Sequence, residues 1–248
     1  MRYFLGIDDT DVLGHRPGTG RLVRDLGAYL EAQREARLVG VIRHQLLVDP
    51  RIPYTSHNSP ACLIVEADGE PDEVAQRLFD IAAGYIVTRA APGSDPGVCL
   101  GEAEHIADDV LQFGYRASSE VVAKADALAL ASRHDLLLVE LGGTGDGVIG
   151  ALAAVGLTAE GNAGRFLELA GGLRGFGEEA PASALRQRGI SLLSVSRNGD
   201  VVPAEALIAT GDWVRPRLIG GRPVLLVEQA GDGWCCFDRK AQHAEPTE

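Results

Sequence analysis

The segment from residue 148 to residue 157 constrains the fold more than any other part of the sequence. It reads Val-Ile-Gly-Ala-Leu-Ala-Ala-Val-Gly-Leu and contains no charged or hydrogen-bonding side chain. A helix that is apolar on all sides is buried on all sides, so we expect this segment inside the protein. A chain of 248 residues with 46% hydrophobic residues is long enough for one substantial core or two small ones.

The N-terminal part alternates between expected strands and expected helices. Apolar runs predict three strands, at residues 2–8, 38–48 and 61–67. The spacing of four between Leu22, Leu26 and Leu30 predicts an amphipathic helix that covers one face of the sheet. A second helix is expected from Pro71 to Tyr85, because proline is favourable in the first turn of a helix. The order strand, helix, strand, strand, helix resembles one half of a ferredoxin-like fold.

The rest of the chain divides by character. Residues 102–131 are expected to be helical and to be divided at Gly114, and residues 136–141 form an apolar strand. Beyond about residue 175 the pattern changes to short strands with glycine-containing turns. We therefore expect an α+β fold, rich in α/β elements, with a first region at 1–175 and a β-rich C-terminal section at 176–248.

Charge and cysteine content exclude several classes of protein. Lys and Arg number 23 against 35 Asp and Glu, and the net charge of −12 repels a polyanion, so we expect tRNA binding only with help from a partner. The four cysteines form no Cys-x-x-Cys pair, which disfavours a structural zinc site. Carboxylates interrupt the opening apolar run at Asp8, and no later run is long enough to span a bilayer. We expect a cytoplasmic protein without a membrane segment.

Three carboxylates, Asp8, Asp9 and Asp11, follow the first predicted strand within four positions. Burying such charges together is costly unless a cation compensates them. Mg²⁺ prefers oxygen ligands and commonly joins one or two carboxylates to substrate phosphates. The sequence therefore predicts a magnesium site, although a solvated turn-forming acidic segment is the alternative.

A glycine run, Gly142-Gly143-Thr144-Gly145-Asp146-Gly147, stands directly before the apolar helix. Backbone N–H groups at a helix N-terminus favour phosphate, so Gly143, Gly145 and Gly147 are candidates for nucleotide binding. The run lacks the Gly-Lys-Ser/Thr of a Walker A loop, and a tight strand-to-helix turn is the alternative. The Asp146 carboxylate would oppose an anion there unless a metal ion lay between them.

Two further polar residues lie in turns near these motifs. Thr19, in Gly18-Thr19-Gly20, stands at the expected start of the first helix, where a hydroxyl commonly serves as the N-cap. Beside a phosphate and a magnesium ion, the same hydroxyl could accept a phosphoryl group. Asn58 lies in a proline-rich loop and could hydrogen-bond a substrate, although surface-loop residues often have no specific role.

Four motifs in the same order resemble the archaeal tRNA-isoleucine 2-agmatinylcytidine synthetases (TiaS). They are Gly-Ile-Asp-Asp-Thr-Asp at 6–11, Ile52-Pro53-Tyr54 leading to Asn58, Ser-Asp-Pro-Gly at 94–97, and Gly-Val-Ile-Gly-Ala-Leu-Ala-Ala-Val-Gly at 147–156. Together they cover roughly residues 1–175 and are far more specific than any one alone. The resemblance implies that residues 1–175 form the catalytic region and contain a kinase-like ATP site.

The resemblance implies a set of residue roles. That family uses magnesium and ATP to phosphorylate the carbonyl oxygen of an anticodon cytosine, after which the amine agmatine displaces the phosphate. Asp8, Asp9 and Asp11 would then hold magnesium, and Thr19, preceded by Gly18, would stand at the position of an autophosphorylated threonine. Asn58 falls where the family has a Gly-Asn-Gly-Ala segment.

Three departures from the family's pattern shape the functional hypothesis. The first loop has a one-residue insertion at 17–20, Asp146 replaces a residue that is often basic, and the oligonucleotide-binding fold and zinc ribbon are not found. We expect a magnesium-dependent, ATP-consuming phosphoryltransferase or ligase that acts on a small or non-tRNA acceptor, with an amine as a possible co-substrate. The alternatives are tRNA cytidine modification with a partner supplying tRNA recognition, and a regulatory protein that binds Mg·ATP without turnover. The oligomeric state is left open.

Overall fold

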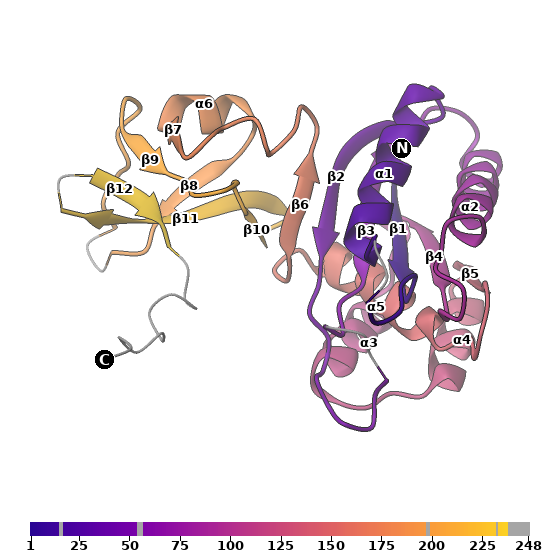
Figure 1. Cartoon of the computed structure of the whole chain (residues 1–248). Coiled ribbons are helices and arrows are strands. Elements are labelled where there is room, and N and C mark those ends of the chain that lie inside the picture. The colour runs from indigo at the N-terminus through magenta and orange to yellow at the C-terminus, as the bar shows by residue number, and fades with distance from the viewer. Residues whose placement is uncertain (15–16, 54–56, 197–198, 232, 238–248) are drawn as a thin grey trace. The chain divides into compact units, whose positions relative to one another are not determined.

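The computed structural model describes residues 1–14, 17–53, 57–196, 199–231 and 233–237 (Figure 1). Tyr54, part of one family-like motif, lies outside the described residues. The chain forms two compact units, Met1–Ala170 and Gly171–Glu248. Each unit is described by itself.

The first unit contains a complete ferredoxin-like arrangement. Its elements are, in order, β1 (Arg2–Asp8), α1 (Thr19–Ala32), β2 (Arg37–Arg43), β3 (Ala61–Glu66), α2 (Pro71–Val87) and β4 (Gly97–Glu102). The four strands lie in the order β4-β1-β3-β2 with antiparallel pairing throughout. Two further antiparallel strands extend this sheet, β5 (Leu137–Glu140) beside β4 and β6 (Arg165–Leu169) beside β2. The predicted α+β class and ferredoxin-like topology are confirmed.

One face of this sheet packs against α1 and α2 (Figure 1). Alternate side chains of β1, Tyr3, Leu5 and Ile7, are fully buried in a cluster with the apolar stripe of α1 and with Val74, Leu78 and Ile86 of α2. This alternation follows from the two-residue period of a strand, which places every second side chain on the same face. The prediction that Leu22, Leu26 and Leu30 cover the sheet is confirmed.

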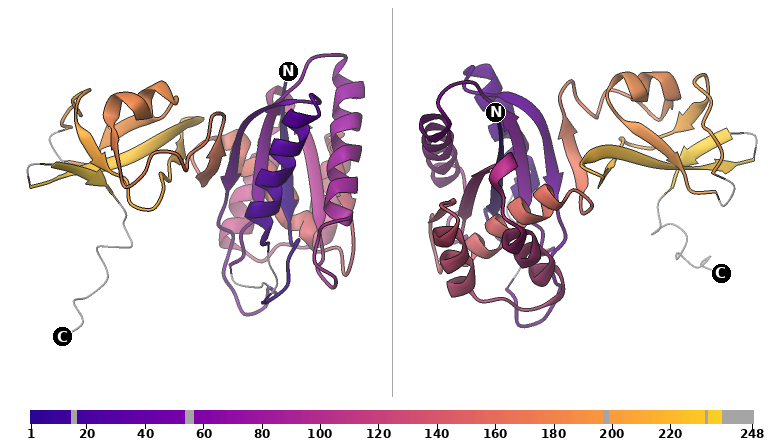
Figure 2. Two further views of the ribbon diagram at one scale, coloured as in Figure 1. Left: turned by 45° about the horizontal axis from the view of Figure 1, so that its top comes forward. Right: turned by 180° about the vertical axis from the view of Figure 1, so that it is seen from behind.

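The opposite face carries α5 (Gly147–Glu160), which lies between the sheet and α3 (Asp108–Ser119), with α4 (Lys124–Arg133) beside them (Figure 2). A Cβ atom added at Gly6 of β1 would overlap the Ala151 carbonyl oxygen of α5. On the other side of α5, a Cβ atom added at Gly156 would overlap the carbonyl oxygen of Val110 in α3. Neighbours on both sides explain why this helix has no polar face, and its predicted burial is confirmed.

The helical segment after β4 differs from the expectation. It consists of a short 3₁₀ turn, η1 (Ala103–His105), followed by α3 and α4, and the break falls after Ser119 rather than at Gly114. Gly114 lies inside α3, where a Cβ atom would come within 3.0 Å of the Ala153 carbonyl oxygen of α5. The prediction of a break at Gly114 is therefore wrong, because this glycine permits close helix packing. Strand β4, at Gly97–Glu102, was also not predicted.

The second unit is rich in strands, as its turn-rich sequence predicts. Its elements are β7 (Glu179–Pro181), α6 (Ala182–Gln187), β8 (Ser191–Ser194), β9 (Leu207–Ala209), β10 (Arg217–Ile219), β11 (Arg222–Ala230) and β12 (Gly233–Cys236). β11 pairs with β8, β10 and β12, while β9 joins β12 to β7. In both units, the described helices are all too short or too polar to cross a membrane.

The close approach of α5 to the sheet can be tested at Gly6. We expect Gly6→Ala to lower the free energy of unfolding by about 1–3 kcal/mol, because the new methyl group overlaps the backbone of α5. Gly84→Ala is the matched control, since this glycine lies in α2 with open space around its Cβ position, and there alanine should raise stability by up to about 1 kcal/mol. Urea denaturation measures both changes, and equal stability of the two variants would contradict the packing described.

Candidate functional site

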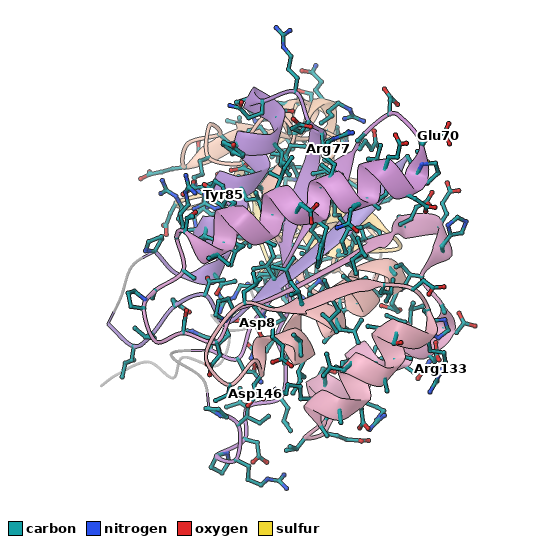
Figure 3. The ribbon with its side chains drawn as sticks, turned by 90° about the vertical axis from the view of Figure 1, so that its right-hand side faces the viewer. Asp8, Glu70, Arg77, Tyr85, Arg133 and Asp146 are labelled. Carbon is teal, nitrogen blue, oxygen red and sulfur yellow. The ribbon has the colours of Figure 1, made fainter. Side chains whose placement is uncertain are left out.

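The candidate site lies at the C-terminal end of β1, where the chain leaves the sheet. Asp8 is the last residue of this strand, and its carboxylate contacts α5 so closely that a Cβ atom at Gly150 would overlap it. Asp9 follows with φ of 55°, a left-handed conformation that Asp tolerates better than most residues. Figure 3 shows Asp8 and Asp146 near the same end of the first unit, with Glu70 toward the opposite end.

The carboxylates at this end of the sheet disfavour one another's ionised forms. Burial and then the neighbouring Asp9 carboxylate raise the pKa of Asp8 to about 7. Burial also raises the pKa of Asp9 to about 6, with further contributions from Asp95, Asp11 and Asp146. Five carboxylates from three separate segments therefore create a strongly negative site, which is the setting that a bound cation stabilises.

Asp95 organises the glycine run before α5. The Thr144 N–H donates to Asp95 Oδ1 at 2.7 Å, the Thr144 hydroxyl donates to Oδ2 at 3.1 Å, and the Gly147 N–H donates to the Asp95 carbonyl oxygen at 3.2 Å. The Gly145 N–H donates to the Gly142 carbonyl oxygen within the turn. The run thus holds a carboxylate of the protein itself, and phosphate binding by Gly143, Gly145 and Gly147 stays a prediction.

The start of α1 lies beside the acidic segment. Gly18, not Thr19, is the N-cap, and it provides no side-chain cap, so the predicted capping role of Thr19 is wrong. Thr19 is the first helical residue, and its buried hydroxyl accepts hydrogen bonds from the Thr10 N–H at 3.3 Å and the Thr10 hydroxyl at 3.0 Å. A Cβ atom at Gly18 would lie 3.0 Å from Asp11 Oδ2, so this carboxylate sits directly at the N-terminus of α1.

Asn58 holds the loop between β2 and β3. Its side-chain amide donates to the Leu47 carbonyl oxygen at 2.8 Å, and its own carbonyl oxygen accepts from the Leu46 N–H at 2.9 Å. These bonds fix the loop next to Ser59, whose hydroxyl oxygen accepts a hydrogen bond from Arg43. The bonds explain a structural role for Asn58, and its catalytic role stays a prediction.

The sequence reasoning missed two arginines at this end of the sheet. Arg43 ends β2 and lies in register with Arg165 at the start of β6, on the same level as Ile7 and Ala61 of the central strands. Burial and the charge of Arg165 lower the pKa of Arg43, whereas Asp11 opposes that shift. The one signal in the sequence was a charged residue, Arg43, at the end of an apolar strand. Its pairing with Arg165 of β6 could not be predicted from the sequence.

The carboxylates fit a metal ion shared with a substrate better than a closed metal site. Within the described part of the chain, no three His, Cys, Asp or Glu residues are arranged closely enough to hold a metal ion by themselves. Mg²⁺ commonly takes only one or two protein carboxylates and completes its coordination with water and phosphate oxygens. Assignment of Asp8, Asp9 and Asp11 as its ligands therefore stays a prediction that the charge arrangement favours.

Comparison with known proteins gives a structural likeness only. No protein-family model and no curated protein sequence matches the chain. The structure of apo TiaS, a tRNA agmatidine synthetase, matches with a TM-score of 0.51 and 25% identity over 63% of this chain and 35% of that chain. The complex of TiaS with its tRNA and ATP matches with a TM-score of 0.54 and 29% identity, and a tRNA fluorescent labeling enzyme with 0.52 and 26%, each over 63% of this chain and 36% of the other.

The protein thus spans about a third of the length of the solved structures it matches. Identities of 25–29% with TM-scores above 0.5 agree with the resemblance to TiaS that the four sequence motifs carry. On structural grounds, 63% of the chain is a TiaS-like region.

Proposed function

We propose that this protein is a magnesium-dependent enzyme that consumes ATP by phosphoryl transfer, as a kinase-like step or as the first half of a ligase reaction. The observation that carries the proposal is the group of carboxylates around Asp8 and Asp9, gathered beside the N-terminus of α1. Mutual repulsion of these charges is relieved by a divalent cation, and Mg·ATP brings that cation together with phosphate. TiaS, whose solved complexes contain ATP or AMPCPP, supports the same interpretation.

The chain's own residues take distinct roles in this proposal. Asp8 and Asp9 bind the metal ion, with Asp11 beside them, and the bound magnesium would neutralise phosphate charge during transfer. Gly18, the N-cap of α1, provides no side chain, and a phosphate oxygen is proposed to lie beside this helix start. Thr19 presents a hydroxyl at the same place and is the proposed first acceptor of the phosphoryl group.

In our leading proposal, the phosphoryl group is finally transferred to a small or non-tRNA substrate, because the chain's net charge of −12 disfavours binding of a polyanion. A second candidate is cytidine modification in tRNA with agmatine as the amine, with a partner supplying tRNA recognition. A solved complex of TiaS with tRNA, AMPCPP and agmatine favours that candidate. A third possibility is that the protein binds Mg·ATP without turnover, and an experiment must distinguish this from the two enzyme functions.

Product analysis tests the enzyme proposal directly. Purified protein incubated with Mg·ATP should release ADP or AMP, and Asp8→Asn should lower the rate at least about a hundredfold, because it removes a metal-binding charge. Asp80→Asn, an exposed carboxylate on α2, is the matched control and should keep the wild-type rate. Parallel reactions should contain no acceptor, a pool of small amines including agmatine, or tRNA plus agmatine.

The reactions also separate the candidate functions. Stimulation by tRNA plus agmatine above either alone would favour the modification reaction over a small acceptor. Tight, magnesium-dependent ATP binding with no product in any tube would establish a non-catalytic role. Equal rates for wild type and Asp8→Asn would show that the carboxylate site does not carry the turnover.

The raised pKa values of Asp8 and Asp9 predict how metal-free stability depends on pH. In the folded protein these carboxyls bind protons up to pH values of about 7 and 6, whereas the ordinary value for Asp is 3.8. Their contribution therefore stabilises the fold at low pH and is lost as pH rises from about 4 to about 7. Relative to Asp8→Asn, wild type should become progressively less stable over this range in EDTA, as measured by thermal unfolding.

Magnesium should reverse that loss. Binding to ionised carboxylates stabilises the folded state, so the rise in Tm caused by Mg²⁺ should grow as pH increases toward about 8. Asp8→Asn should show a smaller rise, whereas Asp80→Asn should match wild type. If Mg²⁺ does not change the Tm of wild type at about pH 8, the upper end of the range, either with or without ATP, the metal assignment is contradicted.

The role of Thr19 can be determined from covalent modification. After incubation with Mg·ATP, intact-mass measurement and peptide mapping should find one phosphoryl group on Thr19, because its hydroxyl lies at the uncapped helix start beside Asp11. Thr19→Val should abolish the modification and Thr19→Ser should retain it. Modification of Thr10 instead, or an unmodified wild-type protein that still turns over ATP, would remove Thr19 from the proposed reaction.

A further inference from the structure

Thr144, in the glycine run before α5, connects side chains that come from distant parts of the sequence. Its N–H and its hydroxyl both donate to the Asp95 carboxylate, at 2.7 and 3.1 Å, and Asp95 lies in the loop before β4. The Thr144 carbonyl oxygen accepts a hydrogen bond from Lys124 Nζ at 2.7 Å. Lys124 begins α4 and also forms an ion pair, at 3.2 Å, with Glu140 at the end of β5. The backbone and the side chain of Thr144 are therefore both fixed by charged partners.

The glycines on either side of Thr144 allow the turn to approach these carboxylates. A Cβ atom added at Gly143 would overlap the Asp95 carboxylate, and one added at Gly145 would overlap the Glu140 carboxylate. Both glycines have positive φ, 57° and 75°, in the left-handed region that favours glycine. The run of glycines thus has a role in holding carboxylates of the protein itself, and this role does not require a bound phosphate.

Asp95 also lies beside the segment that carries the proposed metal ligands. Gly97, two residues further along the chain, is the register partner of the last residue of β1. On the other side of Asp95, the Ala91 N–H donates to the Thr10 carbonyl oxygen at 2.9 Å. The loop that contains Asp95 is therefore tied to the acidic segment at both of its ends. After burial, the charge of Asp95 accordingly makes the largest contribution to the raised pKa of Asp9.

We propose that Thr144 is a positioning residue for the metal site: it holds the Asp95 carboxylate beside Asp9, and the charge of Asp95 strengthens the binding of Mg²⁺. The N–H and the hydroxyl of Thr144 are neutral donors, so they fix the carboxylate without adding a positive charge of their own. Removal of groups that surround metal ligands in this way commonly lowers metal affinity about 10- to 100-fold. The inference rests on the proposed function, because that function supplies the metal ion.

Two other routes connect Thr144 with the metal site, because the turn continues directly into α5. Asp146, the N-cap of α5, lies in the same turn, and its charge also acts on Asp9. Further along α5, the helix contacts the Asp8 carboxylate at Gly150. If Thr144 acted through the helix in either of these ways, loss of its hydroxyl would have the same effect whether or not residue 95 is charged.

A double-mutant cycle on Mg²⁺ binding distinguishes these routes. Calorimetric titration of the full chain measures the affinity, alone and with a non-hydrolysable ATP analogue, at a pH where the carboxyls of the site are ionised. Thr144→Val lacks the hydroxyl and should weaken binding at least about fivefold, whereas Thr144→Ser keeps it and should stay within about twofold of wild type. Asp95→Asn removes the charge and should weaken binding at least about tenfold. In the Asp95→Asn background, Thr144→Val should change the affinity less than about twofold, because no charge is left to position.

Thr210→Val is the matched control, because it removes a hydroxyl hydrogen bond of 2.8 Å to the Gly177 carbonyl oxygen in the second unit. This variant should bind Mg²⁺ like wild type. Thermal unfolding in EDTA should show that every compared variant is folded at the assay temperature, and Thr144→Ala replaces Thr144→Val in the cycle if the valine variant is not folded.

The outcomes separate the positioning role from the proposed function. An affinity of Thr144→Val within about twofold of wild type, or an equal loss in the wild-type and Asp95→Asn backgrounds, would overturn the positioning role while leaving the metal site in place. Wild type that binds no Mg²⁺, either alone or with the ATP analogue, would overturn the metal site and the positioning role together. If Mg²⁺ binds and the two substitutions are coupled, but ATP is never consumed, the role of Thr144 is supported and the proposed enzyme function alone fails.

Discussion

The contact between helix α5 and the sheet is the constraint on which the site depends. Glycines at Gly6 and Gly97 let the backbone of α5 lie directly on β1 and β4, where any larger residue would overlap it. The same approach places Asp8 against Gly150 and removes much of the water around this carboxylate. Burial, more than the neighbouring charges, therefore produces the raised pKa of Asp8.

The ferredoxin-like strand order then distributes charge across one end of the sheet. Central β1 carries Asp8 and leads to Asp9, while β4, its neighbour, follows Asp95, so the negative groups gather on one side. Arg43 and Arg165 come from β2 and β6 on the other side.

The sequence was sufficient for features that depend on local pattern. An apolar run predicted β1, four-residue spacing predicted α1, and a helix without polar side chains predicted the burial of α5, because each pattern reflects the faces that an element buries. The break expected at Gly114 was wrong, since that glycine serves contact with α5 and its role is set by Ala153, which is distant in the sequence. The arginine pair depends on the register between β2 and β6, which no local pattern encodes. The sequence showed the three carboxylates of the first motif and Asp95 in a separate motif, but not that Asp95 lies close enough to act on Asp9.

A crystal structure of the full chain with Mg²⁺ and a non-hydrolysable ATP analogue tests the account most directly. We expect a metal ion bound by Asp8 or Asp9 and by phosphate oxygens of the nucleotide, next to the start of α1 at Gly18. Nucleotide bound with its phosphates away from the end of β1, or bound there without a metal ion contacting any of these carboxylates, would contradict the central claim that the buried acidic group exists to hold magnesium and phosphate together.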